Sequence, residues 1–255
     1  MPTKNVAPYK RNFLNKVILK CDYDFIDLGK LEEFAKSVKA IFPFQESQEG
    51  VNREMEIDFN KGKVISNNGI KSKQWNLLSA DRNKYLLITP NFVSLEYINN
   101  SYKNKTELVS DFEKTLLPFL NFFKINTVNR IGLRYLNDIN LNSIKGDFDW
   151  SIFFHKDLLN GIYLNKRLKN DLSRSMSTTE MKQGEANIRF TYGIWNKDYP
   201  NENTRKEFIL DIDCYSKFPH DTNETITETI KEYNKISENI FEKNIKDGLR
   251  NILRK

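Results

Sequence analysis

The sequence predicts an α+β fold made of two tandem β-α-β-β-β-α-like units, in which a long helix covers each antiparallel sheet. Two observations lead to this prediction. Segments whose apolar residues alternate with other residues, as in strands, are interspersed with segments whose apolar residues recur every three or four positions, as in helices. The same order of segments then occurs twice along the chain.

The first half predicts one helix between strands and a second helix after them. Alternation over residues 17–23 indicates a strand, and helical spacing over residues 28–41 indicates a helix that ends before Pro43. Further strands are expected at residues 55–59, 74–80, 85–89 and 92–97, with turns at 67–69 and 90–91. A helix over residues 104–123 follows, with Asn104 and Glu107 as a capping box and a kink or an early end at Pro118.

The second half repeats this order less clearly. Strands are expected at residues 128–137, 174–181, 188–195 and 208–215, with a short helix within 150–159. One apolar stripe from Ile226 to Ile252 predicts a terminal helix, opened by Thr225 and Glu228 as a second capping box.

The boundary between the two units is expected after residue 125, which gives an N-terminal unit at 1–125 and a C-terminal unit at 126–255. The alternative is that the two sheets join into one continuous domain. The order of elements resembles helix-on-sheet folds of the TATA-binding-protein or helix-grip type. That likeness concerns architecture and carries no function.

Composition limits the class of protein. With 39% hydrophobic residues, 18 Phe and 11 Tyr, the 255-residue chain has enough apolar surface to exclude disorder. Lys and Arg number 40 against 34 Asp and Glu, and the net charge of +6 is compatible with a polyanionic partner. The positive charges are scattered among acids, so this balance permits such a partner without requiring one.

The chemistry of the chain favours the cytoplasm. Cys21 and Cys214 lie far apart in the sequence and provide no disulfide framework, which favours a reducing compartment. The first 20 residues are polar and lack the apolar core of a signal peptide. No apolar run reaches the length of a membrane span, so we expect a cytoplasmic protein without a membrane partner and leave its oligomeric state open.

Two strands carry charges in a pattern that points to pairing or to ligand binding. In a strand, Arg130, Gly132 and Arg134 share one face, and Asp211 and Asp213 share a face of a later strand. The two guanidinium groups and the bare glycine could receive a planar or phosphate-bearing group. The favoured interpretation is a ladder of ion pairs between the arginines and the aspartates, because buried charges are costly unless paired.

The two aspartates also allow a metal-site hypothesis, since Asp-x-Asp pairs hold divalent ions in some phosphoryl-transfer sites. Neither is followed by further carboxylates or histidines at a fixed spacing. His155 and His220, the only histidines, form no zinc-finger spacing with the cysteines. We therefore assign no metal, no cofactor and no catalytic residue from the sequence.

A third candidate surface combines cations with aromatic rings. Arg189 and Trp195 are expected on one face of the strand at residues 188–195, where a nucleic acid could stack or a protein could pack. The same face could equally be covered by a helix or by another chain.

The sequence resembles a known family in three places. These are the motif RIGLRYLN at residues 130–137, the motif LDIDCY at 210–215, and the terminal helix containing Phe241 and Glu242. The family is a sporadically distributed, uncharacterised prokaryotic family of similar length, with an RIGLRYxN strand and a later LDxD strand. The resemblance spans nearly the whole chain, and the family's Pro-rich opening is only vaguely matched by residues 7–9. It implies a patchily inherited accessory protein linked to mobile or antiviral-defence loci, and it implies no activity.

Together these features predict a non-enzymatic binding or adaptor protein of a prokaryotic accessory system, with a protein or a nucleic acid as partner. The alternative is a metal-dependent enzyme that acts on phosphate esters of nucleotides or nucleic acid. In that alternative Arg130 and Arg134 hold the phosphate, and Asp211 and Asp213 hold the metal.

Overall fold

The computed structural model describes residues 9–52, 55–58, 63–66, 70–169, 171–216, 219–221 and 225–255. Its largest element is one antiparallel sheet. Its strands are β1 (Leu14–Asp22), β2 (Phe44–Asn52), β5 (Ile70–Leu78), β6 (Lys84–Ile88), β7 (Phe92–Ile98), β9 (Arg130–Asn140), β10 (Ser175–Gln183), β11 (Ala186–Ile194) and β12 (Glu207–Tyr215). They form a nine-stranded sheet in the order β10-β11-β12-β9-β1-β7-β6-β5-β2.

Two short strand pairs lie outside this sheet: β3 (Met55–Asp58) with β4 (Lys63–Ser66), and β8 (Thr127–Val128) with β13 (His220–Asp221). The α-helices are α1 (Leu31–Ser37), α2 (Lys105–Asp111), α3 (Leu117–Phe122), α4 (Asn160–Leu168), α5 (Thr225–Asn244) and α6 (Asp247–Arg254). A π-helical segment, η1 (Phe112–Leu116), joins α2 to α3, and two 3₁₀ turns, η2 (Trp150–Ile152) and η3 (Lys156–Leu159), precede α4.

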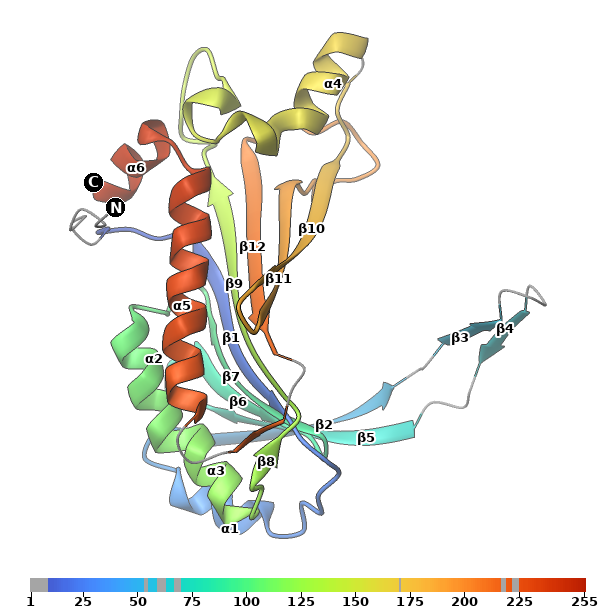
Figure 1. Cartoon of the computed structure of the whole chain (residues 1–255), viewed down its shortest axis with the longest axis vertical. Coiled ribbons are helices and arrows are strands. Elements are labelled where there is room, and N and C mark those ends of the chain that lie inside the picture. Colours follow the sequence, from blue (N-terminus) through green and yellow to red (C-terminus); the bar gives the residue numbers. More distant parts are fainter. Residues whose placement is uncertain are drawn as a thin grey trace.

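The prediction of two separate helix-covered sheets is wrong, because the structure is one large sheet with a few helices beside it (Figure 1). β1 from the first half pairs antiparallel with β9 from the second half, with Leu19 opposite Leu133. An unpaired strand edge exposes a row of backbone donors and acceptors, and joining two such edges satisfies both. Periodicity reports which residues face the core, but it does not report which edges meet.

The hydrophobic core lies between one face of the sheet and the helices. Leu19 is buried together with its neighbours in register, Leu95 on β7 and Leu133 on β9. On the same face, the Asn234 amide of α5 donates to the Tyr135 hydroxyl at 2.8 Å. Residues one position along these strands point to the opposite face, which we call the open face; it carries the charged residues of the central strands.

Most expected strands are present, with shifted ends. β1, β5, β6, β7, β9, β10, β11 and β12 occupy the expected regions, and β3 covers the strand expected at 55–59 as far as Asp58. The turn at 90–91 forms, since the Thr89 amide donates to the Phe92 carbonyl at 2.9 Å. Three predicted features lie outside the described residues: the turn at 67–69, the end of a strand at residue 59, and the capping side chain of Thr225.

Helices deviate more from the prediction. α1 is shorter than expected, and the terminal stripe folds as α5 and α6, with a break where Ile245 forms a bridge to Phe154. Asn104 caps α2 by accepting from the Glu107 amide at 2.9 Å. Just before Pro118 the helix changes from α- to π-helical geometry in η1, where the Leu117 amide donates to the Phe112 carbonyl five residues earlier. No helix among the described residues is both long and apolar enough to cross a membrane.

Candidate functional site

The open face brings the four charged residues of the two motifs together. β9 and β12 pair with Asp213 opposite Arg134 and Asp211 opposite Leu136. Arg134 reaches diagonally to Asp211, where its Nε donates to Oδ1 at 2.8 Å and its Nη2 donates to Oδ2 at 2.6 Å. A bidentate guanidinium–carboxylate pair of this kind is stronger and more directional than a single contact.

The space beside Gly132 is filled by Arg130. The Arg130 guanidinium lies 4.7 Å from the centroid of the Tyr215 ring, and Tyr215 is opposite Gly132 in register. Its Nη1 is 3.6 Å from Asp22 Oδ2, and its Nη2 is 3.5 Å from Asp213 Oδ2. A Cβ at position 132 would lie 3.0 Å from Nη1. The glycine therefore admits the protein's own guanidinium at the place where the sequence suggested a ligand.

Arg189 extends this arrangement to the next strands. On β11 it stands opposite Asp213, and its Nε donates to Glu180 Oε1 on β10 at 2.9 Å. We call the seven charged residues connected in this way the charge ladder: Asp22, Arg130, Arg134, Glu180, Arg189, Asp211 and Asp213. It crosses five adjacent strands from β10 to β1. Its geometry matches the ion-pair interpretation, and a ligand-binding role for its members remains a prediction.

Asp213 is the member of the charge ladder whose ionised form is destabilised by burial. Burial raises the pKa of the Asp213 carboxyl, and Arg130 and Arg134 offset this rise only in part. By contrast, hydrogen bonding to Asp211 raises the pKa of the Arg134 guanidinium and keeps it charged. Both carboxylate oxygens of Asp211 accept from Arg134, so a metal ion there would have to displace the guanidinium. Within the described part of the chain, no three His, Cys, Asp or Glu residues cluster as metal ligands would.

Trp195 lies away from the charge ladder, just beyond the end of β11. This residue is 46% exposed. The Arg174 guanidinium stacks 4.1 Å from the centroid of the Trp195 ring and 4.2 Å from the centroid of the Tyr199 ring. Sequence reasoning singled out Trp195 but missed Arg174 and Tyr199, because strand periodicity gives no sign of contacts made by a loop.

The helix α4, which the sequence did not predict, lies at the same end of the molecule (Figure 1). A Cβ on Gly161 would be 2.0 Å from Ser175 Oγ, so the first turn of α4 rests against the start of β10. Tyr163, Leu164 and Leu168 project from it with 41%, 47% and 57% of their surface exposed. Arg174 directly precedes Ser175, and Ser175 is opposite Ile194, the residue before Trp195, so α4 and the Trp195–Arg174–Tyr199 stack meet at the start of β10. We call the three α4 side chains and this stack the apical patch.

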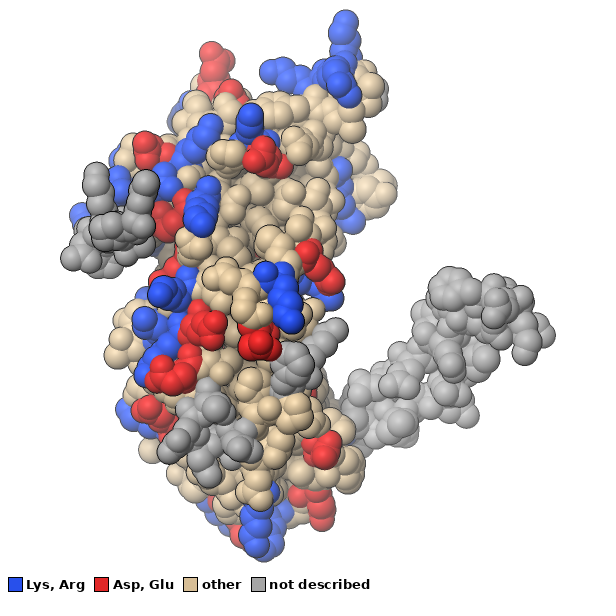
Figure 2. All heavy atoms as spheres, viewed as in Figure 1, with Lys and Arg blue, Asp and Glu red and all other residues tan. Residues whose placement is uncertain are grey.

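Cations lie beside the α4 part of the apical patch. Lys166, Arg167 and Lys169 are exposed on α4 and at its C-terminal end. Figure 2 shows Lys and Arg side chains projecting from the end of the molecule that α4 occupies. A signal for this surface was present in the sequence as the run LNKRLK at residues 164–169, in which leucines flank a basic cluster.

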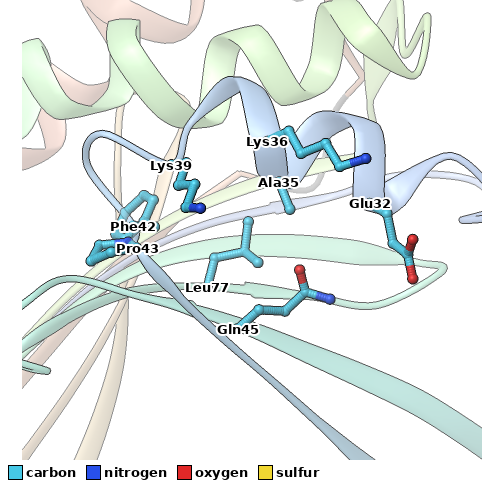
Figure 3. Close-up of a pocket in the computed structure, with 8 residues that line it drawn as sticks. All are labelled: Glu32, Ala35, Lys36, Lys39, Phe42, Pro43, Gln45 and Leu77. Atoms are coloured by element: carbon cyan, nitrogen blue, oxygen red, sulfur yellow. The ribbon is translucent and has the colours of Figure 1, made fainter.

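A separate pocket of about 300 Å³ lies between the α1 segment and the strands β2 and β5. In Figure 3, Glu32, Lys36 and Lys39 approach it from the helical side, and Leu77 and Gln45 approach it from the strands. The buried side chains of Phe42 and Leu77 give it an apolar floor. None of the candidate site residues chosen from the sequence lines it.

Comparisons with known proteins add no assignment: no family model, no curated protein and no solved structure matches this chain. Its function is therefore argued from the geometry of its own surfaces.

Proposed function

We propose that the protein is a non-catalytic adaptor that binds an acidic partner protein at the apical patch. The observation that carries this proposal is the concentration of exposed apolar surface there. Ten large hydrophobic side chains are exposed among the described residues, and five of them (Tyr163, Leu164, Leu168, Trp195 and Tyr199) belong to this patch. Clustered apolar side chains rimmed by polar ones are typical of interaction sites.

The chemistry of the apical patch suits a protein partner. Trp, Tyr and Arg are the residues most enriched at the energetic centres of protein interfaces. Stacking on Arg174 holds the Trp195 and Tyr199 rings in place before a partner arrives, which lowers the entropy lost on binding. Leu164 and Leu168, one helical turn apart, offer apolar anchors that a nucleic acid has little means to cover.

Charge indicates that this partner is acidic. Residues 160–174 contain four cations (Lys166, Arg167, Lys169 and Arg174) and one acid (Asp171), a balance of 4 − 1 = +3. The charge ladder, in contrast, contains three arginines and four acids, a balance of 3 − 4 = −1. Residues 160–174 thus carry a local excess of positive charge beside the apical patch, where it would steer an acidic surface into contact.

Membership in the family with the RIGLRYxN strand, and a role in a prokaryotic accessory or defence system, stay proposals that rest on the sequence motifs. They are compatible with an adaptor, because such a protein needs a docking surface and no catalytic set.

Photo-crosslinking in cells tests the proposed docking. A photoreactive residue at Leu164 or Tyr199 should capture a discrete protein, and the same residue at Phe122, which is 38% exposed on α3, should not. Capture at Leu164 should fall at least several-fold when Lys166 and Arg167 are both changed to Glu, because the excess positive charge is then reversed.

Three results would contradict the proposal. The first is equal capture at Phe122 and at the apical patch. The second is a nucleic acid rather than a protein in the crosslinked species. The third is metal-dependent hydrolysis of a phosphate ester by the purified protein that disappears in Asp211→Asn, which would establish the enzymatic alternative.

A further inference from the structure

The strand β10 ends the sheet with an open edge. It pairs with β11 over nine residues in one unbroken register, from Ser175 opposite Ile194 to Gln183 opposite Ala186. The described residues place no strand on its other side, and Figure 1 shows β10 at the outer margin of the sheet. Residues 177–183 are all exposed. This edge therefore presents backbone donors and acceptors that a further strand can pair with.

Proteins usually protect such an edge with charged side chains, a proline, a bulge or a covering element. β10 (SMSTTEMKQ) has no proline, and its register with β11 shows no bulge. Its charged side chains are Glu180 and Lys182, two positions apart and thus on the same face of the sheet. Opposite charges at this spacing allow the strand to be complementary to itself.

Only one antiparallel register of β10 with a second β10 uses this complementarity. When Met181 faces its own counterpart, Glu180 of each copy faces Lys182 of the other. A register centred on Glu180 or on Lys182 would place like charges opposite each other, which is destabilising. A register centred on Thr179 would place Glu180 opposite Thr178 and leave the charges unpaired.

The same register continues features already present in each copy. On the open face, Glu180 already binds Arg189 at 2.9 Å, so the incoming Lys182 would extend the charge ladder into the second sheet. On the other face, Met181 is 39% exposed and would cover its counterpart with apolar surface.

We propose that two copies of this chain associate through antiparallel pairing of β10 about Met181, which joins their sheets edge to edge. The five residue pairs from Thr179 to Gln183 form a small contact, so the dimer is weak and concentration-dependent. This association uses a surface other than the apical patch and does not depend on the proposed adaptor function.

Charge exchange between two variants tests the register. Glu180→Lys places lysine opposite lysine at both symmetry-related contacts, and Lys182→Glu places acid opposite acid, so each variant alone should dimerise at least several-fold more weakly than the wild type. When the two variants are mixed, positions 180 and 182 are both lysine in one copy and both glutamate in the other. Each lysine then faces a glutamate, so the mixture should form a heterodimer. Sedimentation velocity from about 10 µM to about 1 mM measures all four samples over the range of weak association. Lys103→Glu, on an exposed loop, is the matched control and should dimerise as the wild type does.

A crosslink tests the position of the symmetry axis. Residues directly opposite each other in antiparallel strands have Cα atoms about 4.5–5.5 Å apart, within the range of a disulfide. Oxidised Met181→Cys should therefore form a covalent dimer. Ser177→Cys, exposed on the same face of the strand, should not, because its copy would lie eight positions away, about 26 Å. The native thiols do not interfere, since Cys21 and Cys214 are buried.

The proposal is overturned if the wild type stays monomeric over this range, if both charge variants dimerise as strongly as the wild type, or if Ser177→Cys crosslinks as readily as Met181→Cys. Mixed variants that associate no better than either alone would also overturn it. All these measurements use the purified full chain without a partner, so their failure leaves the apical patch unaffected. Conversely, failure of the crosslinking at Leu164 leaves the β10 pairing unaffected.

Discussion

Single residues in the charge ladder differ in how firmly they are held. Arg134 makes two short hydrogen bonds to one carboxylate, whereas Arg130 makes two longer contacts to two carboxylates and lies over a ring. The pattern Arg-x-Gly-x-Arg was enough to predict that both arginines share a face, and Asp-x-Asp was enough to predict paired acids. Asp22 and Glu180 could not be predicted as partners, because they belong to strands whose neighbours the sequence does not reveal.

A double-mutant cycle measures the Arg134–Asp211 pair. We expect Arg134→Ala and Asp211→Ala each to destabilise the fold, with a coupling of about 1 kcal/mol in urea unfolding. The control is the pair Arg205–Asp198, with Nε and Oδ2 2.9 Å apart, whose coupling should be smaller because the Asp198 side chain is 50% exposed and that of Asp211 only 13%. Stable single variants without measurable Arg134–Asp211 coupling would contradict a structural ladder and favour a ligand site.

The raised pKa of Asp213 predicts a pH dependence. The folded protein binds the Asp213 proton more tightly than the unfolded chain does, because the pKa of this carboxyl is raised in the fold. The stability that the protonated carboxyl contributes is therefore complete below the ordinary Asp pKa of about 3.9, and it is lost as the pH rises through the raised pKa. Asp213→Asn cannot ionise, so it should gain stability relative to the wild type as the pH rises above about 4. Urea unfolding at a series of pH values gives this difference.

Asp81 supplies a control of opposite sign. Its pKa is lowered, chiefly by the hydrogen bond from Ser79, so its ionised form stabilises the fold above the ordinary Asp pKa. Asp81→Asn should therefore lose stability relative to the wild type over the same rise in pH. A loss of the same sign in Asp213→Asn would refute the inferred cost of burying its charge.

At the scale of elements, strands were easier to predict than helices. The alternation at Met55, the run before Thr89 and the run through Ile212 each marked a real strand. β2 escaped prediction because its sequence, FQESQEGVN, has no apolar alternation. α4 escaped because three of its apolar residues, 162–164, are consecutive and do not recur every three or four positions, the usual signature of a packed helix.

Gly193 decides how closely β10 and β11 approach at the apical end. Its φ is +135°, and a Cβ there would lie 2.0 Å from the Ser175 carbonyl oxygen. Gly193→Ala should therefore cost about 2 kcal/mol or more in chemical unfolding, because both the backbone and the neighbouring strand must move. Gly146→Ala is the matched control: its φ is +80° but nothing lies within 4 Å of the added Cβ, so it should cost about 1 kcal/mol. Equal losses in the two variants would show that the close approach to Ser175 is not limiting.

At the scale of the whole molecule, the sequence indicated the parts better than their assembly. Alternation at Val17, Leu19 and Cys21 correctly predicted a strand with one buried face. The pairing of that strand with β9 was beyond reach, because both edges of β1 look the same in the sequence. The apical patch shows the same limit: Trp195 was noticed, but its contact with Arg174 joins residues that are 21 positions apart.

The central position of β1 also has a consequence for the order in which the protein is made. A ribosome completes β1, β2, β5, β6 and β7 before it begins β9, so the nascent chain can assemble half of the sheet with one side of β1 unpaired. That edge stays open until residues 130–140 emerge. During this interval the growing chain exposes an unpaired strand edge in addition to that of β10, and a strand of a neighbouring nascent chain can pair with it.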